Sequence, residues 1–263
     1  MNYLIAIDSD GTLRRSDGTI SDVTKKAIFK QIKNNNVVVI CTARPRYHTL
    51  KIAKEVGASN YLISSNGSEL YDFSENKLIW ATYVNKEDCI KLYKYSKKEN
   101  IRIMFVIENT EYVTQFIRDD AQILLNDENF DKVLEGNVKQ IMVIGKDKEK
   151  IENFKNIVIN EYKLNILDSS SKNKEEMWFS IVGKKASKGI ALLKLAEYLN
   201  ISSDNIVSIG NDNNDISMFE VAKISVVVSN STENALKKAK YITESNDNDG
   251  VALFLEQLYK EIL

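Results

Sequence analysis

Short apolar runs alternate with amphipathic stretches in the N-terminal part of the chain. The runs Tyr3–Ile7, Val37–Cys41 and Tyr61–Ile63 have the length and side-chain types of buried strands. Two helical patterns separate them, one that begins near Ser21, a plausible N-cap, and one that runs through Leu50–Val56. This strand–helix–strand alternation favours a parallel sheet with helices on both of its faces.

The same alternation returns in the C-terminal part. The expected elements there are a helix at Lys188–Leu199, a strand at Ile206–Ile209, a short helix at Ile216–Val221, a strand at Ile224–Val228, and helices at Thr232–Lys240 and Val251–Ile262. The two parts together predict an α/β fold with one doubly wound core.

Between them, from about Thr82 to Val182, the pattern changes. Antiparallel strands are expected at Ile101–Ile107, Tyr112–Gln115, Lys139–Ile144 and Met177–Ile181, and helices at Lys86–Glu99 and Lys148–Tyr162. This region has the pattern of an α+β insertion into the core. No Pro-rich linker marks its edges, because the only proline is Pro45.

Composition narrows the class of protein. With 263 residues, the chain is long enough for one large domain or for a core with a smaller second domain. A formal net charge of -1 argues against a general nucleic-acid binder, which needs a basic surplus. The N-terminus lacks the pattern of a signal peptide, no apolar run could span a bilayer, and Cys41 and Cys89 cannot make a disulfide framework. We therefore expect a reduced, cytoplasmic protein that binds neither nucleic acid nor membrane.

Two carboxylates follow the first predicted strand directly. Asp8 and Asp10 stand two residues apart in a DxDG segment that ends at Gly11. Ligands of open α/β sheets bind beyond the carboxyl ends of the strands, so both carboxylates can face one site. One could attack phosphorus or bind a metal while the other gives and takes a proton. An ordinary Asp/Gly turn is the alternative, whereas the spacing does not fit an EF-hand loop.

Three more polar groups fall at strand ends or helix starts. Thr42 follows the second strand and could cradle an anion or simply cap the next helix. Lys188 opens a helix and could balance phosphoryl charge, or be one more surface lysine. The oxygen-rich segment at 210–215 follows the strand Ile206–Ile209 and suits Mg²⁺, although Asn/Asp-rich turns are common. Each signal is weak by itself, but four clusters at the ends of separate strands make a strong case for one site.

These clusters resemble the four motifs of the haloacid dehalogenase-like phosphatases. The resemblance is carried by Asp8-Ser9-Asp10-Gly11-Thr12, Thr42, Lys188 and Gly210-Asn211-Asp212-Asn213-Asn214-Asp215. Together with Ser65-Asn66-Gly67-Ser68 and the insertion, their order is similar to the Cof-type subfamily. The resemblance implies a Rossmann-like core at 1–81 and 184–263 and an α+β cap at 82–183 that sets substrate selectivity.

The resemblance also implies roles for individual residues. Asp8 would attack phosphorus and become an aspartyl-phosphate, while Asp10 would protonate the leaving oxygen and then activate water. Thr42, Lys188 and Asn214 would bind the substrate phosphate. The implied Mg²⁺ ligands are Asp8, Asp10 through its carbonyl, and the fourth motif, for which Asn211 and Asp215 are the candidates.

Two positions depart from the family pattern. Asn211 stands where an Asp is usual, so metal binding could be weaker, or Asp212 or Asp215 could contribute more to it. Ala43 replaces the usual glycine of the second motif, which affects how closely the backbone approaches a phosphate.

Two further features are set aside. His48, the only histidine, lies on a predicted helix and is better explained by surface or packing than by catalysis. The segment from Ser245 to Gly250 resembles an EF-hand calcium loop, but Ser245 stands where Asp is needed and a strand, not a helix, is expected before it.

The sequence thus predicts a magnesium-dependent phosphatase for small phosphorylated metabolites, with sugar phosphates as the leading class. A phosphomutase or phosphotransferase is the enzymatic alternative. A catalytically impaired binding or regulatory protein is the other, which Asn211 makes conceivable and the presence of both Asp8 and Asp10 disfavours. Neither the ester nor the oligomeric state follows from the sequence.

Overall fold

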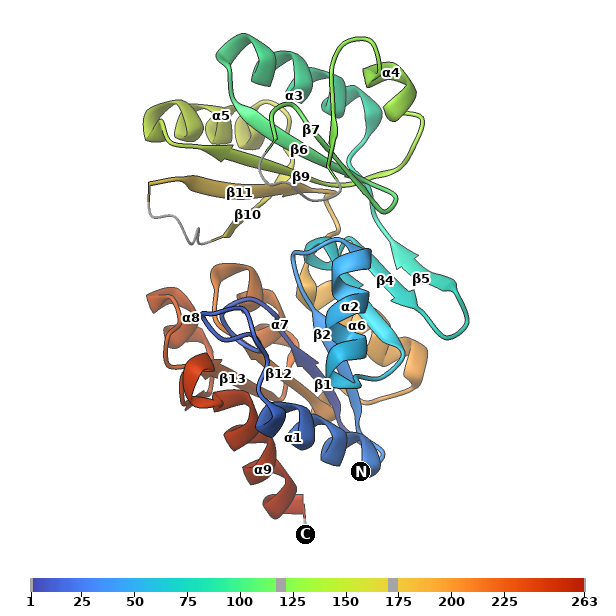
Figure 1. Ribbon diagram of the computed structural model, residues 1–263, viewed down its shortest axis with the longest axis vertical. Coiled ribbons are helices and arrows are strands. Elements are labelled where there is room, and N and C mark those ends of the chain that lie inside the picture. Colours follow the sequence, from blue (N-terminus) through green and yellow to red (C-terminus); the bar gives the residue numbers. More distant parts are fainter. Residues whose placement is uncertain (1, 117–121, 170–174, 263) are drawn as a thin grey trace. The chain divides into compact units, whose positions relative to one another are not determined.

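The computed structural model describes residues 2–116, 122–169 and 175–262 (Figure 1). The chain folds into two compact units, the first of which combines residues 1–80 with 187–263 and the second of which holds residues 81–186. The backbone therefore passes between the units twice, after Trp80 and after Ala186. The insertion expected from the sequence, 82–183, falls within the second unit.

A largely parallel sheet organises the first unit. In the described part of the chain its strand order is β14-β13-β12-β1-β2-β3-β4-β5. The strands are β1 (Leu4–Ile7), β2 (Val37–Cys41), β3 (Tyr61–Ser64), β4 (Glu69–Asp72), β5 (Lys77–Ala81), β12 (Ile206–Gly210), β13 (Ile224–Val228) and β14 (Tyr241–Thr243). In this spatial order, the first six strands, from β14 to β3, run parallel to one another, and β4 runs antiparallel to β3. Their order is that of a doubly wound nucleotide-binding sheet, with its switch point between β1 and β12. The predicted α/β fold class is confirmed.

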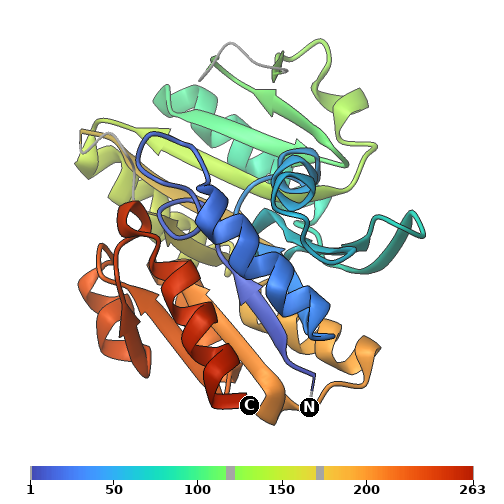
Figure 2. The same ribbon diagram turned by 60° about the horizontal axis from the view of Figure 1, so that its bottom comes forward.

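Helices cover both faces of this sheet, as Figures 1 and 2 show. One face carries α1 (Asp22–Lys33), α2 (Arg46–Val56) and α9 (Gly250–Ile262), and the other carries α6 (Lys188–Leu199), α7 (Ile216–Val221) and α8 (Glu233–Lys238). Along β1, Ile5 and Ile7 pack with the first set, whereas Leu4 and Ala6 pack with the second. Side chains of a strand alternate between faces, so a strand covered on both sides must be apolar at every position.

Local chemistry fixes the helix ends near the site. The Ser21 side chain accepts a hydrogen bond from the Thr24 N–H, and the Ser187 side chain accepts one from the Ile190 N–H. Each of these caps satisfies a backbone donor that the first turn of a helix leaves unpaired. Gly57 ends α2 in the left-handed conformation, with φ 65°. The first residues of α1 and α6 are therefore determined by sequence features close to them.

The second unit is an α+β layer. Its described strands lie in the order β10-β11-β9-β6-β7-β8. They are β6 (Arg102–Ile107), β7 (Thr110–Val113), β8 (Gln122–Leu124), β9 (Val138–Gly145), β10 (Asn165–Ser169) and β11 (Met177–Val182). The helices are α3 (Lys86–Glu99), α4 (Phe130–Val133) and α5 (Lys148–Asn160). Apolar residues of β6, β9 and β11, such as Phe105, Ile141 and Phe179, form one core with the helices.

Several elements differ from the expectations. The strands β4, β5, β8 and β10 and the helix α4 were not predicted, and β7 begins at Thr110 instead of Tyr112. β5 lies at the sheet edge and all five of its residues are at least partly exposed, although positions 78–81 form a short apolar run. The short elements give too few residues for a period to emerge.

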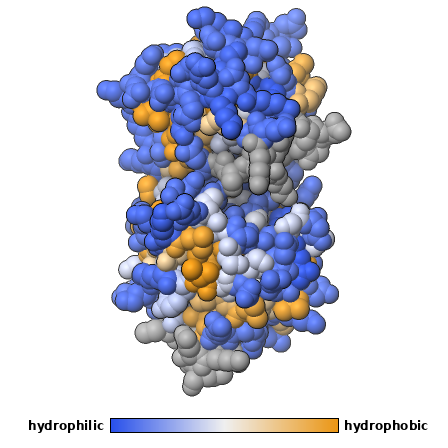
Figure 3. Space-filling model, turned by 90° about the vertical axis from the view of Figure 1, so that its left-hand side faces the viewer, coloured by the Kyte–Doolittle hydropathy of each residue, from blue (hydrophilic) through white to orange (hydrophobic). Residues whose placement is uncertain are grey.

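Hydrophilic side chains predominate on the face shown in Figure 3, and apolar side chains form separate patches among them. Within residues 2–116, 122–169 and 175–262, no helix has the length and apolar character needed to cross a membrane. Cys41 and Cys89 are both free and buried.

Candidate active site

The first unit brings the four polar clusters to one end of its sheet. Asp8 follows β1, Thr42 follows β2, Asn211 follows β12, and Lys188 is the first residue of α6. β1 pairs with both β2 and β12, so these loops are neighbours. The carboxyl ends of parallel strands at a switch point form the ligand-binding crevice of such sheets.

Lys188 links two carboxylates at the bottom of this crevice. Its Nζ donates to Asp8 Oδ1 at 2.6 Å and to Asp215 Oδ1. All three residues are buried. Burial and the Asp215 charge raise the pKa of Asp8, while the Lys188 ammonium opposes them. Burial alone would lower the pKa of Lys188, but the Asp215 and Asp8 carboxylates raise it. One ammonium thus binds two carboxylates. When both are ionised, one negative charge remains unbalanced, and a bound cation could balance it.

Asp215 orients the loop after β12. Its Oδ2 accepts hydrogen bonds from the N–H groups of Asn211, at 2.8 Å, and Asp212, at 3.0 Å. The carboxylate packs on Gly210, where an added Cβ would lie 2.6 Å from Asp215 Cγ. Both Asp215 oxygens are therefore engaged inside the protein, and a direct bond to a metal would have to replace one of these contacts.

The Asn211 side chain ends beside the Asp8 carboxylate. With its amide nitrogen turned inward it donates to Thr12 Oγ1 at 2.9 Å, to the Asp10 carbonyl at 3.1 Å and to Asp8 Oδ2 at 3.2 Å. With Oδ1 turned inward it accepts from the Thr12 hydroxyl and faces the Asp10 and Asp8 oxygens. Oxygens that face one another across this spot suit a hard cation, whereas the other orientation satisfies the metal-free protein.

Asp10 is held by an arginine. Arg44 Nε donates to Asp10 Oδ2 at 2.6 Å, and one of its terminal nitrogens donates to Oδ1 at 2.8 Å. This fork is the strongest geometry available to an ion pair of these groups. The Asp10 side chain retains 37% of its exposure and is open to solvent, whereas Asp8 is largely buried.

The loop that carries Thr42 rests on a left-handed turn. Asn66 N–H donates to the Thr42 carbonyl at 3.1 Å, and Asn66 Oδ1 accepts from Asn214 Nδ2 at 2.9 Å. Ser65, Asn66 and Gly67 all have positive φ, at 49°, 56° and 82°. A Cβ on Gly67 would lie 2.2 Å from the Ser187 carbonyl, so only glycine lets the turn reach the start of α6. The turn thereby joins the second, third and fourth motifs.

Two residues at this site were absent from the predicted set. Arg44 stands two residues after Thr42, and its basic character was the available signal. Asn66 was noted only for its family resemblance, and its position next to Asn214 follows from the tertiary structure. Of the predicted residues, Lys188 contacts both Asp8 and Asp215. Asn211 lies against Asp8 and the Asp10 carbonyl. Asn214 binds Asn66, whose N–H donates to the Thr42 carbonyl.

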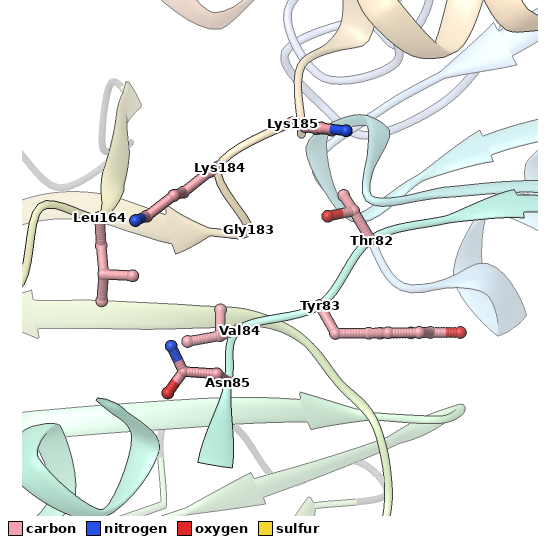
Figure 4. Close-up of a pocket in the computed structure, with 8 residues that line it drawn as sticks. All are labelled: Thr82, Tyr83, Val84, Asn85, Leu164, Gly183, Lys184 and Lys185. Carbon is pink, nitrogen blue, oxygen red and sulfur yellow. The ribbon is translucent and has the colours of Figure 1, made fainter. Parts of the chain in front are cut away.

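A separate pocket of about 350 Å³ belongs to the second unit (Figure 4). Its lining residues are Thr82, Tyr83, Val84, Asn85, Leu164, Gly183, Lys184 and Lys185. Gly183 packs tightly here, because an added Cβ would lie 2.6 Å from Thr82 Oγ1. The lining holds two lysines and no carboxylate, so it lacks the paired carboxylates found at the end of the first unit's sheet.

Known proteins resemble this chain over almost its whole length. The model of the haloacid dehalogenase-like hydrolase family matches residues 5–255. A 5-amino-6-(5-phospho-D-ribitylamino)uracil phosphatase of Bacillus subtilis is 28% identical, over 97% of this chain and 97% of the relative. A second Bacillus subtilis phosphatase of the same name is 29% identical, over 95% and 92%. The solved structure of a haloacid dehalogenase-like hydrolase from the same species superposes with a TM-score of 0.87 at 25% identity, covering 97% and 99%.

Proposed function

Because this chain belongs to the haloacid dehalogenase-like hydrolase family and is a phosphatase, we propose that it hydrolyses small phosphate esters through an aspartyl-phosphate on Asp8. The predicted family and enzyme class are confirmed by the family match and by relatives that are named phosphatases. The residue roles, the metal and the substrate class are the proposal.

The observation that supports this proposal most directly is the asymmetric surrounding of Asp8. One carboxylate oxygen is held by Lys188 at 2.6 Å, while the other lies beside Asn211 and the Asp10 carbonyl. A buried carboxylate fixed on one side by a cation has few orientations, so the remaining oxygen can be aimed at a ligand. Asp10, the second carboxylate, is half-exposed and stands two residues further along the same loop.

The reaction uses the two carboxylates in two steps. In the first, an Asp8 oxygen forms a bond to phosphorus, the ester P–O bond breaks, and Asp10 gives its proton to the leaving oxygen. In the second, the Asp10 carboxylate takes a proton from water, the water oxygen bonds to phosphorus, and the P–O bond to Asp8 breaks. The products are an alcohol and inorganic phosphate. Since the first step needs a protonated Asp10, its ion pair with Arg44 has to loosen when substrate binds.

Thr42, Lys188 and Asn214 are proposed to hold the phosphoryl oxygens. The Thr42 side chain accepts from the Arg44 N–H at 3.2 Å, which leaves its hydroxyl proton for a ligand. Lys188 is buried against Asp8 and supplies the charge nearest to the nucleophile. Phosphoryl transfer depends mainly on positioning and charge neutralisation, which these groups provide.

The residues present fit a bound Mg²⁺. The inward-facing terminal atom of Asn211 lies 3.1 Å from the Asp10 carbonyl oxygen and 3.2 Å from Asp8 Oδ2. Oxygen ligands of this kind, completed by water, are typical of magnesium. In the part of the chain that the structure describes, no group of three His, Cys, Asp or Glu side chains could share a metal, so an ion at this site would also need carbonyl, amide or water oxygens. When bound, Mg²⁺ would offset the negative charge of the phosphoryl oxygens.

If Asn211 is a metal ligand, Asn211→Asp should lower the Mg²⁺ concentration for half-maximal activity by about tenfold. Two unit charges ~4 Å apart attract each other by about 4 kcal/mol at an effective dielectric near 20, a divalent ion in direct contact gains more, and desolvation offsets much of the gain. In Mg²⁺-free buffer the same variant should melt at a lower temperature, because the new carboxylate faces Asp8, and Mg²⁺ should restore the melting temperature.

Asp212→Asn is the matched control for that titration. The Asp212 side chain accepts from the Asn213 N–H at 2.7 Å and belongs to a capping box, so the exchange should shift the Mg²⁺ requirement less. A large shift for Asp212→Asn together with no shift for Asn211→Asp would assign the metal to a different residue of this loop.

We propose sugar or sugar-alcohol phosphates as the substrate class. Two relatives are named for an ester of a ribityl chain, which is polyhydroxylated. The second unit is proposed to act as a cap that sets selectivity, and the protein is proposed to work in the cytoplasm. A screen of a hexose phosphate, 5-amino-6-(5-phospho-D-ribitylamino)uracil and p-nitrophenyl phosphate tests the class.

The screen reads free phosphate with and without Mg²⁺. Release from the polyhydroxylated esters at a higher kcat/KM than from p-nitrophenyl phosphate is the expected result. A phosphorylated second product in place of free phosphate would identify a phosphotransferase. No release from any ester by a folded, Mg²⁺-loaded protein would contradict the proposed function.

A further inference from the structure

The segment from Ser245 to Gly250 has a structure unlike that of a calcium loop. It is preceded by the strand β14 and forms a single turn of 3-10 helix at Asn246–Asn248. Its two aspartates are engaged by the loop that follows β1: Asp249 binds Arg15 at 2.8 Å, and Asp247 accepts from Ser16. The segment therefore acts on the loop that carries Asp10.

Asn246 is the buried residue of this segment, with 5% of its surface exposed. Its Nδ2 donates to the Arg14 carbonyl at 2.8 Å, and its backbone N–H donates to Asn230 Oδ1 at 3.0 Å. Asn230 Nδ2 in turn donates to the Gly11 carbonyl at 2.9 Å. Two amide side chains from separate loops thus hold the backbone at positions 11 and 14.

Both anchor points follow Asp10 closely in the chain, at Gly11 and at Arg14. The Arg14 N–H donates to the Ser9 carbonyl at 2.9 Å, and Arg14 makes a β-bridge with Asp10. Gly11 has φ 81°, and a Cβ there would lie 2.6 Å from Asn211 Nδ2. A displacement of Gly11 would therefore move both the Asp10 carbonyl and the Asn211 side chain that packs on it.

From this geometry we infer that Asn246 and Asn230 form an amide relay that positions Asp10 and Asn211 for metal binding and proton transfer. The inference rests on the proposed function, since it assigns these two asparagines to the same site. They are positioning residues, because neither touches the reacting atoms. Loss of partners that orient metal ligands typically costs 10–100-fold in metal affinity or activity.

The first test is Mg²⁺ binding measured by calorimetry without substrate. Asn246→Ala is expected to raise the Mg²⁺ Kd by about tenfold or more, and Asn230→Ala by a smaller factor. Asp247→Ala is the matched control, because it lies on the same turn but binds only the exposed Ser16. Its Kd should stay within about twofold of wild type.

Kinetics separate positioning from a general loss of structure. With Asp10 displaced, kcat for an alkyl phosphate should fall about 10- to 100-fold in Asn246→Ala, and less for p-nitrophenyl phosphate, whose leaving group needs little protonation. The double variant should cost less than the product of the two single losses, because the two side chains hold the same short segment of backbone, at Gly11 and Arg14. If Asn246→Ala fails to fold, the same measurements on Asn230→Ala test the inference, because the Asn230 side chain is exposed and its removal should not prevent folding.

An unchanged Mg²⁺ Kd in both asparagine variants, or an equal rise in Asp247→Ala, would overturn the relay. Absence of Mg²⁺ binding to the wild type would overturn it as well. Failure of the proposed function has a different signature: full turnover by Asp8→Asn, or no phosphate release by the wild type, leaves the comparison of Mg²⁺ affinities intact.

Discussion

Asp8→Asn should lower the rate of phosphate release by a factor on the order of 10⁶, as removal of a covalent nucleophile does elsewhere. An amide oxygen cannot form the aspartyl-phosphate. The fold should survive, because burial and Asp215 raise the pKa of Asp8 and so make its ionised form costly in the folded protein. A neutral side chain of equal size removes that cost, so the melting temperature should not fall.

The measurement combines phosphate release with thermal unfolding, and it has a matched control on the same loop. Asp17→Asn changes an exposed carboxylate that binds only Thr19 and should leave turnover unchanged. Beryllium fluoride, which imitates a phosphoryl group on a carboxylate, should bind the wild type and not Asp8→Asn. Near-normal turnover by a folded Asp8→Asn protein would exclude the covalent mechanism.

Asp10→Asn should reduce the rate on an alkyl phosphate by about 10²–10⁴, the usual contribution of a general acid and base. The loss should be smaller for p-nitrophenyl phosphate, because its leaving group departs without protonation. Measuring both esters in one variant separates proton transfer from other roles. An equal loss for both would assign Asp10 a metal-binding or structural role.

Arg44 provides the control for this experiment, since its fork with Asp10 is lost in Asp10→Asn. Arg44→Lys keeps the charge but cannot bind both carboxylate oxygens at once, and we expect a loss of about tenfold or less. If Arg44→Lys reproduced the full effect of Asp10→Asn, the missing ion pair would explain the defect and not the missing proton donor.

The sequence was sufficient for the core of the fold where its signals are local. Val37–Cys41, Lys188–Leu199, Ile216–Val221 and Ile224–Val228 have the predicted bounds. Strands buried on both faces must be apolar at every position, and helices with one buried face have apolar residues every three or four positions. Both patterns can therefore be recognised in the sequence alone. The edge strand β5 contains a run of only four apolar residues, at 78–81, and so short a run does not by itself distinguish a strand from part of a helix.

The site was determined by the sequence in part. Asp8, Asp10, Thr42, Lys188 and the segment 210–215 could be assigned to strand ends and helix starts, because the parallel alternation sends all those ends to one edge of the sheet. Which of these residues touch was left open. The contact of Lys188 with Asp8 spans 180 positions of the chain, and no local pattern encodes a contact of that separation.

By itself, then, the sequence determined the α/β core, the chemistry available at its carboxyl edge and the family to which the chain belongs. Only the tertiary structure decided how that chemistry is divided. In the folded chain, Asp215 is bound by Lys188 and by two backbone amides, and Asp10 is bound by Arg44. Asn246 binds the Arg14 carbonyl in the loop that carries Asp10. The physical reason is that a carboxylate, an amide or an ammonium can serve several partners equally well, and packing of distant segments selects among them.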